Sequence, residues 1–199
     1  MNKKHRHLLA LLLCFVMTVS LFAGYSETKA ASEETTQSED QTETQETGET
    51  REITDMAGRK VTVPAAEDIE SVFSTGPVAA IFMYMVAPDK LLGWNYELND
   101  VEKSIILEKY HDLPNFGMGD AINYEAVIAA NPTIALNCGK INDAMVSDCD
   151  ALSKSLGIPV IAVDNELNNS AEAFRFMGEL LGVEDHAEEL AEYSEKIFT

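Results

Sequence analysis

Basic residues are scarce in this sequence. Its 199 residues include 14 Lys and Arg against 34 Asp and Glu, which gives a formal net charge of -20 at pH 7. From Arg51 onward the counts are 10 and 26. A surface this acidic repels phosphate backbones and offers no basic stripe, so the composition argues against nucleic acid as a partner.

Cysteine is also rare, with three residues in the chain. Cys14 lies in an N-terminal apolar run, which leaves Cys138 and Cys149 in the remainder. A domain of this size needs no disulfide scaffold, and two cysteines can pair only if their Cα atoms come within about 7 Å. Two unpaired, buried thiols are therefore the simpler interpretation, and a disulfide between them is the alternative.

Signatures of catalysis and of metal binding are missing. The sequence has no G-x-S-x-G, no P-loop and no H-E-x-x-H motif. Its four histidines, at positions 5, 7, 111 and 186, are scattered and lack zinc-ligand spacing. We therefore expect a protein that is not an enzyme, has no cofactor of its own and carries no resident metal.

No apolar run reaches the roughly 20 residues of a typical membrane span. The run from Leu8 to Phe22 follows a basic segment and precedes small residues, a layout typical of an export signal over residues 1–25. A permanent N-terminal anchor is the alternative. Tyr25 occupies the place that a lipidated cysteine takes in a lipoprotein processing box, so no diacylglycerol can be attached there.

Residues 26–52 are rich in Ser, Thr, Glu and Gln and have almost no apolar side chains. Such a segment cannot bury enough surface to offset its ordering entropy, so we interpret it as a disordered acidic tether.

Short apolar strands then alternate with helical patterns. Alternation around a Gly-containing turn predicts a hairpin over residues 53–64. The expected strands cover residues 69–73, 90–93, 133–136 and 158–163, and the expected helices cover residues 77–86, 123–130, 142–156, 170–181 and 184–199. This order predicts an α/β fold with a mostly parallel sheet and flanking helices. The last helix has no stop signal, from which we expect a longer parent chain.

Ligands of parallel sheets bind beyond the carboxyl ends of the strands. Thr75, Gly76 and Pro77 begin a helix there, and free N–H groups at a helix start favour anionic groups. Trp94 and Tyr96 offer rings that can stack on flat ligands. The other candidates at this edge are Phe116, Gly117, Met118 and Asn137, with Cys138 and Lys140 as weaker ones. A plain helix start, and core packing of Trp94, are the structural alternatives.

Several motifs in order resemble one family. They are ITDMAGRKVTVP from Ile53, DKLLGW from Asp89, LPNFG from Leu113 followed by NYEAVIAANP from Asn123, LGIPV from Leu156 and MGELLG from Met177. This part of the chain, about residues 51–199, resembles the substrate-binding proteins for iron–siderophore, heme and cobalamin uptake by ABC importers.

That resemblance implies two α/β lobes joined by a long helix, with the ligand between them. Residues 53–165 would be the N-terminal lobe and residues 166–199 would include the start of the linking helix, with the second lobe outside this sequence. It implies an exported, envelope-associated protein that binds a metal chelate and delivers it to a permease–ATPase complex. A molybdate- or tungstate-type binder of the same fold and a non-transport binding or sensor fragment are the alternatives.

Glu125 carries the expected contact with the permease. In the family that the chain resembles, a glutamate at the matching place pairs with arginines of the permease, which can grip a carboxylate with two hydrogen bonds. The alternative is that Glu125 only complements the dipole of its own helix.

Overall fold

The chain begins its described part with a β-hairpin. The computed structural model describes residues 48–198. The predicted export signal, Cys14, Tyr25 and most of the predicted tether lie outside these residues. Strand β1 (Thr50–Thr54) pairs antiparallel with β2 (Lys60–Pro64). The hairpin thus starts before residue 53, so residues 50–52 belong to a strand and not to the tether.

Three parallel strands form the central sheet. They are β3 (Val72–Ser74), β4 (Ile134–Gly139) and β5 (Val160–Asp164), in the order β3-β4-β5. Single parallel bridges join Leu91 to Val72 and Trp94 to Asn115 beyond β3. The predicted α/β class with a parallel sheet is confirmed, but the strand expected over residues 90–93 is only one bridge.

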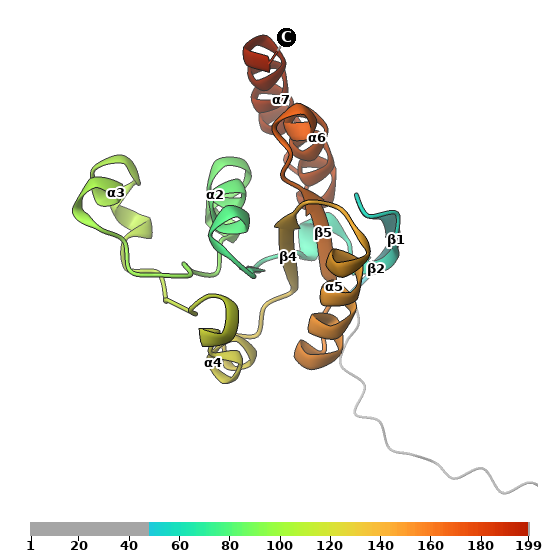
Figure 1. Ribbon diagram of the computed structural model, residues 1–199, viewed down its shortest axis with the longest axis horizontal. Coiled ribbons are helices and arrows are strands. Elements are labelled where there is room, and N and C mark those ends of the chain that lie inside the picture. Colours follow the sequence, from blue (N-terminus) through green and yellow to red (C-terminus); the bar gives the residue numbers. More distant parts are fainter. Residues whose placement is uncertain (1–47, 199) are drawn as a thin grey trace, which may run out of the picture. The chain divides into compact units, whose positions relative to one another are not determined.

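The helices follow the predicted order (Figure 1), with one addition. They are α2 (Pro77–Val86), α3 (Asp100–Ile105), α4 (Tyr124–Ala129), α5 (Asp143–Leu156), α6 (Ser170–Leu181) and α7 (Glu184–Phe198). Helix α3 was not predicted from the sequence. A capping box starts it: the Asn99 side chain accepts hydrogen bonds from two backbone N–H groups, and the Glu102 carboxylate accepts one from the Asn99 N–H. No helix in residues 48–198 is long and apolar enough to cross a membrane.

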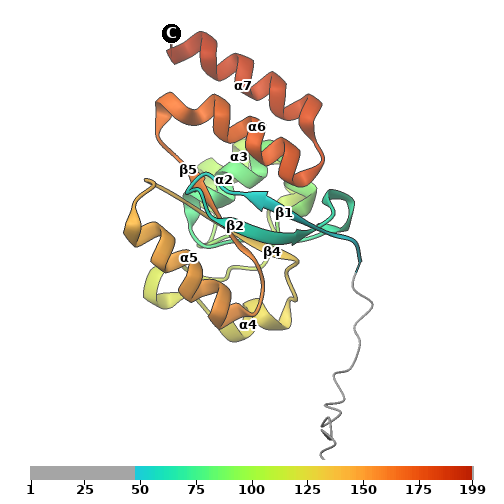
Figure 2. The same ribbon diagram turned by 90° about the vertical axis from the view of Figure 1, so that its right-hand side faces the viewer.

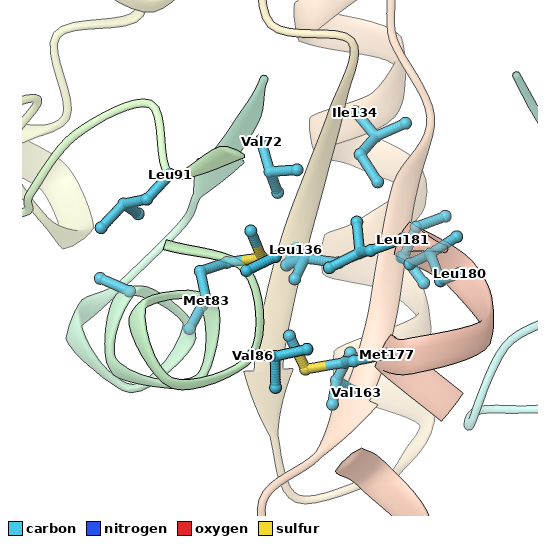
Figure 3. Close-up of a cluster of buried hydrophobic side chains, with 14 of the residues drawn as sticks. Val72, Met83, Val86, Leu91, Ile134, Leu136, Val163, Met177, Leu180 and Leu181 are labelled. Carbon is cyan, nitrogen blue, oxygen red and sulfur yellow. The ribbon is translucent and has the colours of Figure 1, made fainter. Parts of the chain in front are cut away.

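Helices cover both faces of the sheet. Figure 2 shows α6 and α7 on one side of the strands and α4 and α5 on the other. Side chains alternate between the faces along each strand, as strand geometry requires. In β3, Val72 packs into a cluster with α2, α6 and α7, whereas Phe73 packs toward α4 and α5. Figure 3 shows the first cluster, where Met83 of α2 lies beside Leu136 of β4, and Met177 of α6 lies beside Val86 and Val163.

Local signals set most helix ends. The side chain of Asn123 accepts a hydrogen bond at the start of α4, and that of Asn142 does so at the start of α5. Gly157 ends α5 with the positive φ that glycine adopts without strain. From the sequence, Thr75 is also a candidate N-cap of α2, but the capping position is Gly76, and the Thr75 side chain donates to Asn137 instead.

The outer edge of β5 is covered by a buried ion pair from the hairpin turn, here called the clasp (Asp55 and Arg59). The Asp55 carboxylate accepts from the N–H groups of Ala57, Arg59 and Ala162 and from the Arg59 guanidinium. Arg59 in turn donates to the carbonyl of Val160 and to Asp150. Backbone groups of an edge strand would otherwise be left unpaired.

The two described cysteines lie on opposite faces of the sheet. Cys149 is buried in the cluster of α4 and α5, whereas Cys138 packs against the cluster of α2, α6 and α7. Both are free thiols. The interpretation as two unpaired thiols is therefore confirmed, and the alternative of a disulfide is excluded in this structure.

Candidate ligand-binding site

The carboxyl ends of the parallel strands meet at one edge of the sheet, which we call the rim. Hydrogen bonds join its neighbouring segments: the N–H of Thr75 donates to Leu136, and the N–H of Asn165 donates to Gly139. The rim comprises residues 74–77, 94–97, 116–120, 137–140 and 164–166. Four of these five segments were expected from the sequence, with the second ending at Tyr96, because the carboxyl ends of parallel strands lie at the same edge of a sheet.

A chain of side-chain hydrogen bonds runs from the rim into the face below it. The Thr75 hydroxyl donates to Asn137 Oδ1 at 2.9 Å, and Asn137 Nδ2 lies 3.6 Å from Cys149 Sγ. The Cys149 thiol in turn donates to the Met145 sulfur at 3.8 Å. Two sequence-predicted residues, Thr75 and Asn137, are thus held together by contacts that the sequence did not reveal.

Asn95 joins two rim segments from beneath. Its amide nitrogen donates to the carbonyls of Ser74 at 2.9 Å and Gly117 at 3.1 Å. Asn95 is only 2% exposed, and its Oδ1 is buried without a partner, as is the hydroxyl of Ser74. Buried polar atoms without partners are uncommon in folded proteins and often mark functional places.

The start of α2 is open at the rim. Gly76 and Pro77 are half-buried, no side chain caps the helix, and a Cβ added at Gly76 would meet no atom within 4 Å. Pro77 has no N–H, so the free donors of this first turn begin at Val78.

Two of the predicted ligand-contacting aromatics lie in the core and not at the rim surface. Trp94 is 4% exposed; its indole N–H donates to the Tyr110 carbonyl at 2.8 Å, and its ring packs against Tyr84. Phe116 is 3% exposed and packs edge-on against Phe73. These expectations are corrected: both rings stabilise the segments that carry the rim and have no surface to offer a ligand.

The remaining aromatic and loop candidates stay accessible to different degrees. Tyr96 is half-buried, and its hydroxyl donates to Glu102 at 2.8 Å; this hydrogen bond raises the Tyr96 pKa. Met118 is 46% exposed. Gly117 has a positive φ, and a Cβ there would lie 2.2 Å from the Ala121 carbonyl oxygen, so glycine is required by the loop itself.

The end of β5 was the segment that sequence analysis left out. Asp164 is 9% exposed, and its carboxylate accepts from the Glu166 N–H and from Asn169 Nδ2. Glu166 lies 3.3 Å from the ammonium group of Lys140. The rule that selected the other strand ends would also have selected these residues, since they directly follow a buried apolar strand.

The weaker candidates at the end of β4 differ in environment. Lys140 is exposed and paired with Glu166. Cys138 is half-buried, and burial raises the pKa of its thiol to about 12, so it is not a reactive thiolate at neutral pH. In residues 48–198 no group of three or more His, Cys, Asp or Glu side chains is arranged to hold a metal ion.

Glu125 lies on α4, on the face of the sheet opposite α6 and α7. It is exposed and occupies the first turn of the helix, whose start is capped by Asn123. Tyr124 and Ile128 on the same short helix are also exposed, at 39% and 54%. An accessible carboxylate with apolar neighbours therefore projects from this side of the lobe.

The fold has counterparts among solved structures. An ABC transporter solute-binding protein from Sulfurospirillum deleyianum is 22% identical, with a TM-score of 0.60, and the alignment covers 71% of this chain and 45% of that one. The chain has the fold of ABC-transporter solute-binding proteins. This likeness confirms the α/β fold, with a parallel sheet and flanking helices, that the sequence predicted.

Two further solved structures have the same fold. The TroA-like periplasmic binding protein FepB from Veillonella parvula is 26% identical with a TM-score of 0.52, covering 71% of this chain and 45% of that one. Staphylococcus aureus SirA, solved with staphyloferrin B, is 20% identical with a TM-score of 0.53, covering 72% and 46%. This chain therefore spans less than half the length of these solved solute-binding proteins. No protein-family model and no curated protein sequence matches it.

Proposed function

We propose that this protein is an exported solute-binding component of an ABC importer and that its rim forms one wall of the binding site for a metal chelate. The observation that carries the proposal is the convergence of five segments at one edge of a parallel sheet: three follow β3, β4 and β5, and residues 94–97 and 116–120 are joined to them through Asn95. This is the place where α/β sheets bind ligands. No catalytic step is needed for this role.

An intact chelate is favoured over a bare metal ion. The described residues offer no cluster of metal-ligating side chains, so the metal would arrive already coordinated. Solved structures with this fold include SirA complexed with staphyloferrin B, two mutants of the heme-binding protein HmuT, and MolA bound to molybdate. An iron chelate of the siderophore, heme or corrinoid kind is our first candidate, and a molybdate-type oxyanion is the second.

Isothermal titration calorimetry of the chain with a ligand panel tests this proposal. The panel contains ferrioxamine B, ferric enterobactin, ferric dicitrate, heme, cyanocobalamin and molybdate. Tryptophan fluorescence is a poor reporter here because Trp94, the one tryptophan in the sequence, is buried in the core. We expect saturable binding of at least one metal complex; heat of dilution alone with every ligand would contradict the proposal.

Docking to the permease is assigned to Glu125 on the same basis. Its exposed carboxylate stands on the first turn of α4, where it is free to accept two hydrogen bonds from a guanidinium group. The competing role is complementing the helix dipole, which contributes about 0.3–1 kcal/mol of stability and no docking.

Charge reversal separates these two roles. Glu125→Arg should abolish stimulation of ATP hydrolysis by the cognate permease–ATPase complex, reconstituted in proteoliposomes. Glu172→Arg is the matched control, because Glu172 is exposed and lies in the first turn of α6. Both variants should lose the same small stability increment, so equal stimulation by both would leave Glu125 with the dipole role alone.

A further inference from the structure

We infer that the rim selects chelates that present hydrogen-bond donors and carry no net negative charge. This inference rests on the proposed function and narrows it to a ligand class. It follows from two properties of the rim: the direction in which its buried hydrogen bonds run, and the balance of its charges.

The Met145 sulfur can only accept a hydrogen bond, and this determines which group donates at each step of the chain. Met145 has a thioether without a proton, so the 3.8 Å contact requires Cys149 to donate its thiol hydrogen. Cys149 Sγ is then left as an acceptor for the amide nitrogen of Asn137. This fixes the Asn137 amide with its oxygen toward Thr75.

Thr75 therefore presents lone pairs to the ligand side. Its hydroxyl has one hydrogen, which is committed to Asn137 Oδ1 at 2.9 Å. The free lone pairs of Thr75 Oγ1 can accept a hydrogen bond, but the hydroxyl cannot donate to a ligand without losing its hydrogen bond to Asn137. A ligand that approaches this half-buried hydroxyl is favoured if it brings an N–H or O–H group.

Asn95 has the same polarity for an independent reason. Both of its partners, the carbonyls of Ser74 and Gly117, are acceptors, so its amide nitrogen must face them. The atom left without a partner is the acceptor Oδ1, buried directly beneath the rim. Leaving such an atom unsatisfied costs about 1–3 kcal/mol. Because it is fully buried, it gives the rim an acceptor polarity without contacting the ligand, and Thr75 is the group that meets the ligand.

The charges along the rim also disfavour an anionic ligand. The rim contains four carboxylates and one cationic side chain. The carboxylates are those of Glu97, Asp120, Asp164 and Glu166, and the cation is Lys140. Lys140 is itself paired with Glu166. The rim of the described structure thus offers an anionic ligand no unpaired ammonium or guanidinium group.

The start of α2 does not reverse this balance. A helix N-terminus is equivalent to about half a positive charge, and Pro77 removes one of the donors of its first turn. The surrounding carboxylates carry several whole charges of the opposite sign. Their field therefore outweighs the helix terminus for any ligand larger than a single oxyanion, since such a ligand spans several rim segments.

A series of chelates that differ only in charge tests the inference. Ferrioxamine B carries a free ammonium group, its N-acetyl derivative is neutral, and its N-succinyl derivative is anionic, while the iron centre is the same in all three. We expect calorimetric affinity to fall in that order, by about tenfold from the first to the last at low salt, and the difference to shrink as salt is added. Equal affinity, or tighter binding of the succinyl derivative, would overturn the inference.

The wider panel distinguishes failure of the inference from failure of the proposed function. If ferric enterobactin, ferric dicitrate, heme or molybdate binds more tightly than ferrioxamine B and cyanocobalamin, the protein is a solute-binding protein with the opposite ligand preference, and only the inference fails. If none of the six compounds binds, both fail.

Two substitutions connect the preference to the rim. Glu166→Gln frees the charge of Lys140 and should reduce the preference for the cationic over the anionic ferrioxamine about threefold. Glu67→Gln is the control: Glu67 is equally exposed but lies before β3, at the opposite edge of the sheet. An equal effect of the two variants would show that net charge, and not the rim, sets the preference.

Discussion

Buried polar atoms are fully paired at the outer edge of β5 but not at the rim. At the outer edge of β5, the clasp satisfies every oxygen of Asp55: its carboxylate accepts five hydrogen bonds from backbone and guanidinium groups. At the rim, Asn95 Oδ1 and Ser74 Oγ have no partner, and Thr75 keeps spare lone pairs.

This difference separates stability from binding. A buried carboxylate is tolerated only where its lone pairs are filled, because an unpaired charge costs several kcal/mol. The clasp therefore closes an edge that would otherwise pair with another strand. At the rim, by contrast, two buried polar atoms, Asn95 Oδ1 and Ser74 Oγ, have no partner among the described residues, which lowers the stability of the free protein, and the half-buried Thr75 hydroxyl keeps lone pairs for a ligand. Four substitutions or titrations probe this contrast.

Removing the clasp should have the largest effect. Asp55→Ala leaves the Arg59 guanidinium half-buried without its carboxylate and removes the partner of the Ala162 N–H. We expect the free energy of unfolding to fall by about 3–5 kcal/mol, measured by urea denaturation. Glu52→Ala on the same hairpin is the control: its ion pair with Lys60 is exposed, so a loss above about 1 kcal/mol there would refute the contrast.

Asn95 should have an intermediate effect because it is a rim residue with core burial. Asn95→Ala removes the donor to the carbonyls of Ser74 and Gly117. A loss of about 1–3 kcal/mol in the same assay is expected, together with weaker ligand binding. A variant as stable as the parent would mean that these two carbonyls are already solvated.

Alkaline pH should destabilise the fold through Cys138. Burial raises its pKa to about 12, whereas an unfolded thiol titrates near pH 8.5. The folded state keeps the proton that the unfolded state loses, so this contribution is constant below the unfolded pKa, and stability falls between the two values. We expect the loss of stability from about pH 9 to pH 10 to be about 1 kcal/mol smaller in Cys138→Ala, in which the buried Cys149 still contributes. Identical pH profiles of the two proteins would contradict this.

Thr75 should have the smallest effect on stability. Thr75→Val deletes one hydrogen bond to Asn137 at a half-buried position, where water can replace the lost donor. We expect about 0.5 kcal/mol, with a clear shift of the Asn137 side-chain amide resonance. A cost comparable to that of Asp55→Ala would show that the rim, like the clasp, serves stability.

Local sequence signals predicted what is local in the fold. Asn123, Asn142 and Gly157 fix helix ends through their own side chain or φ angle, so their sequence pattern was sufficient. The strand expected over residues 90–93 failed for a partly non-local reason. Residues 88–90 form a turn of 3-10 helix, and the possible partner β3 is only three residues long, so pairing is confined to the bridge between Leu91 and Val72.

The candidate site also has features that the sequence predicted and features that depend on residues distant in the sequence. Topology alone placed the strand-end segments at one edge, and that part of the prediction required only a parallel sheet. Whether a given ring faces out depends on distant residues: Trp94 is drawn into the core by Tyr84 and by the Tyr110 carbonyl. The polarity of Thr75 depends on Cys149 and Met145, which no local pattern around Thr75 indicates.

The most direct test of the binding wall uses the paramagnetism of ferric iron. In a 15N-labelled sample titrated with ferrioxamine B, the rim predicts selective broadening of the amide signals of Thr75, Gly76, Gly117, Asn137 and Lys140, with those of Asp55 to Arg59 unchanged. Broadening centred on the clasp, with the rim amides unchanged, would contradict the assignment of the rim as the ligand-binding wall.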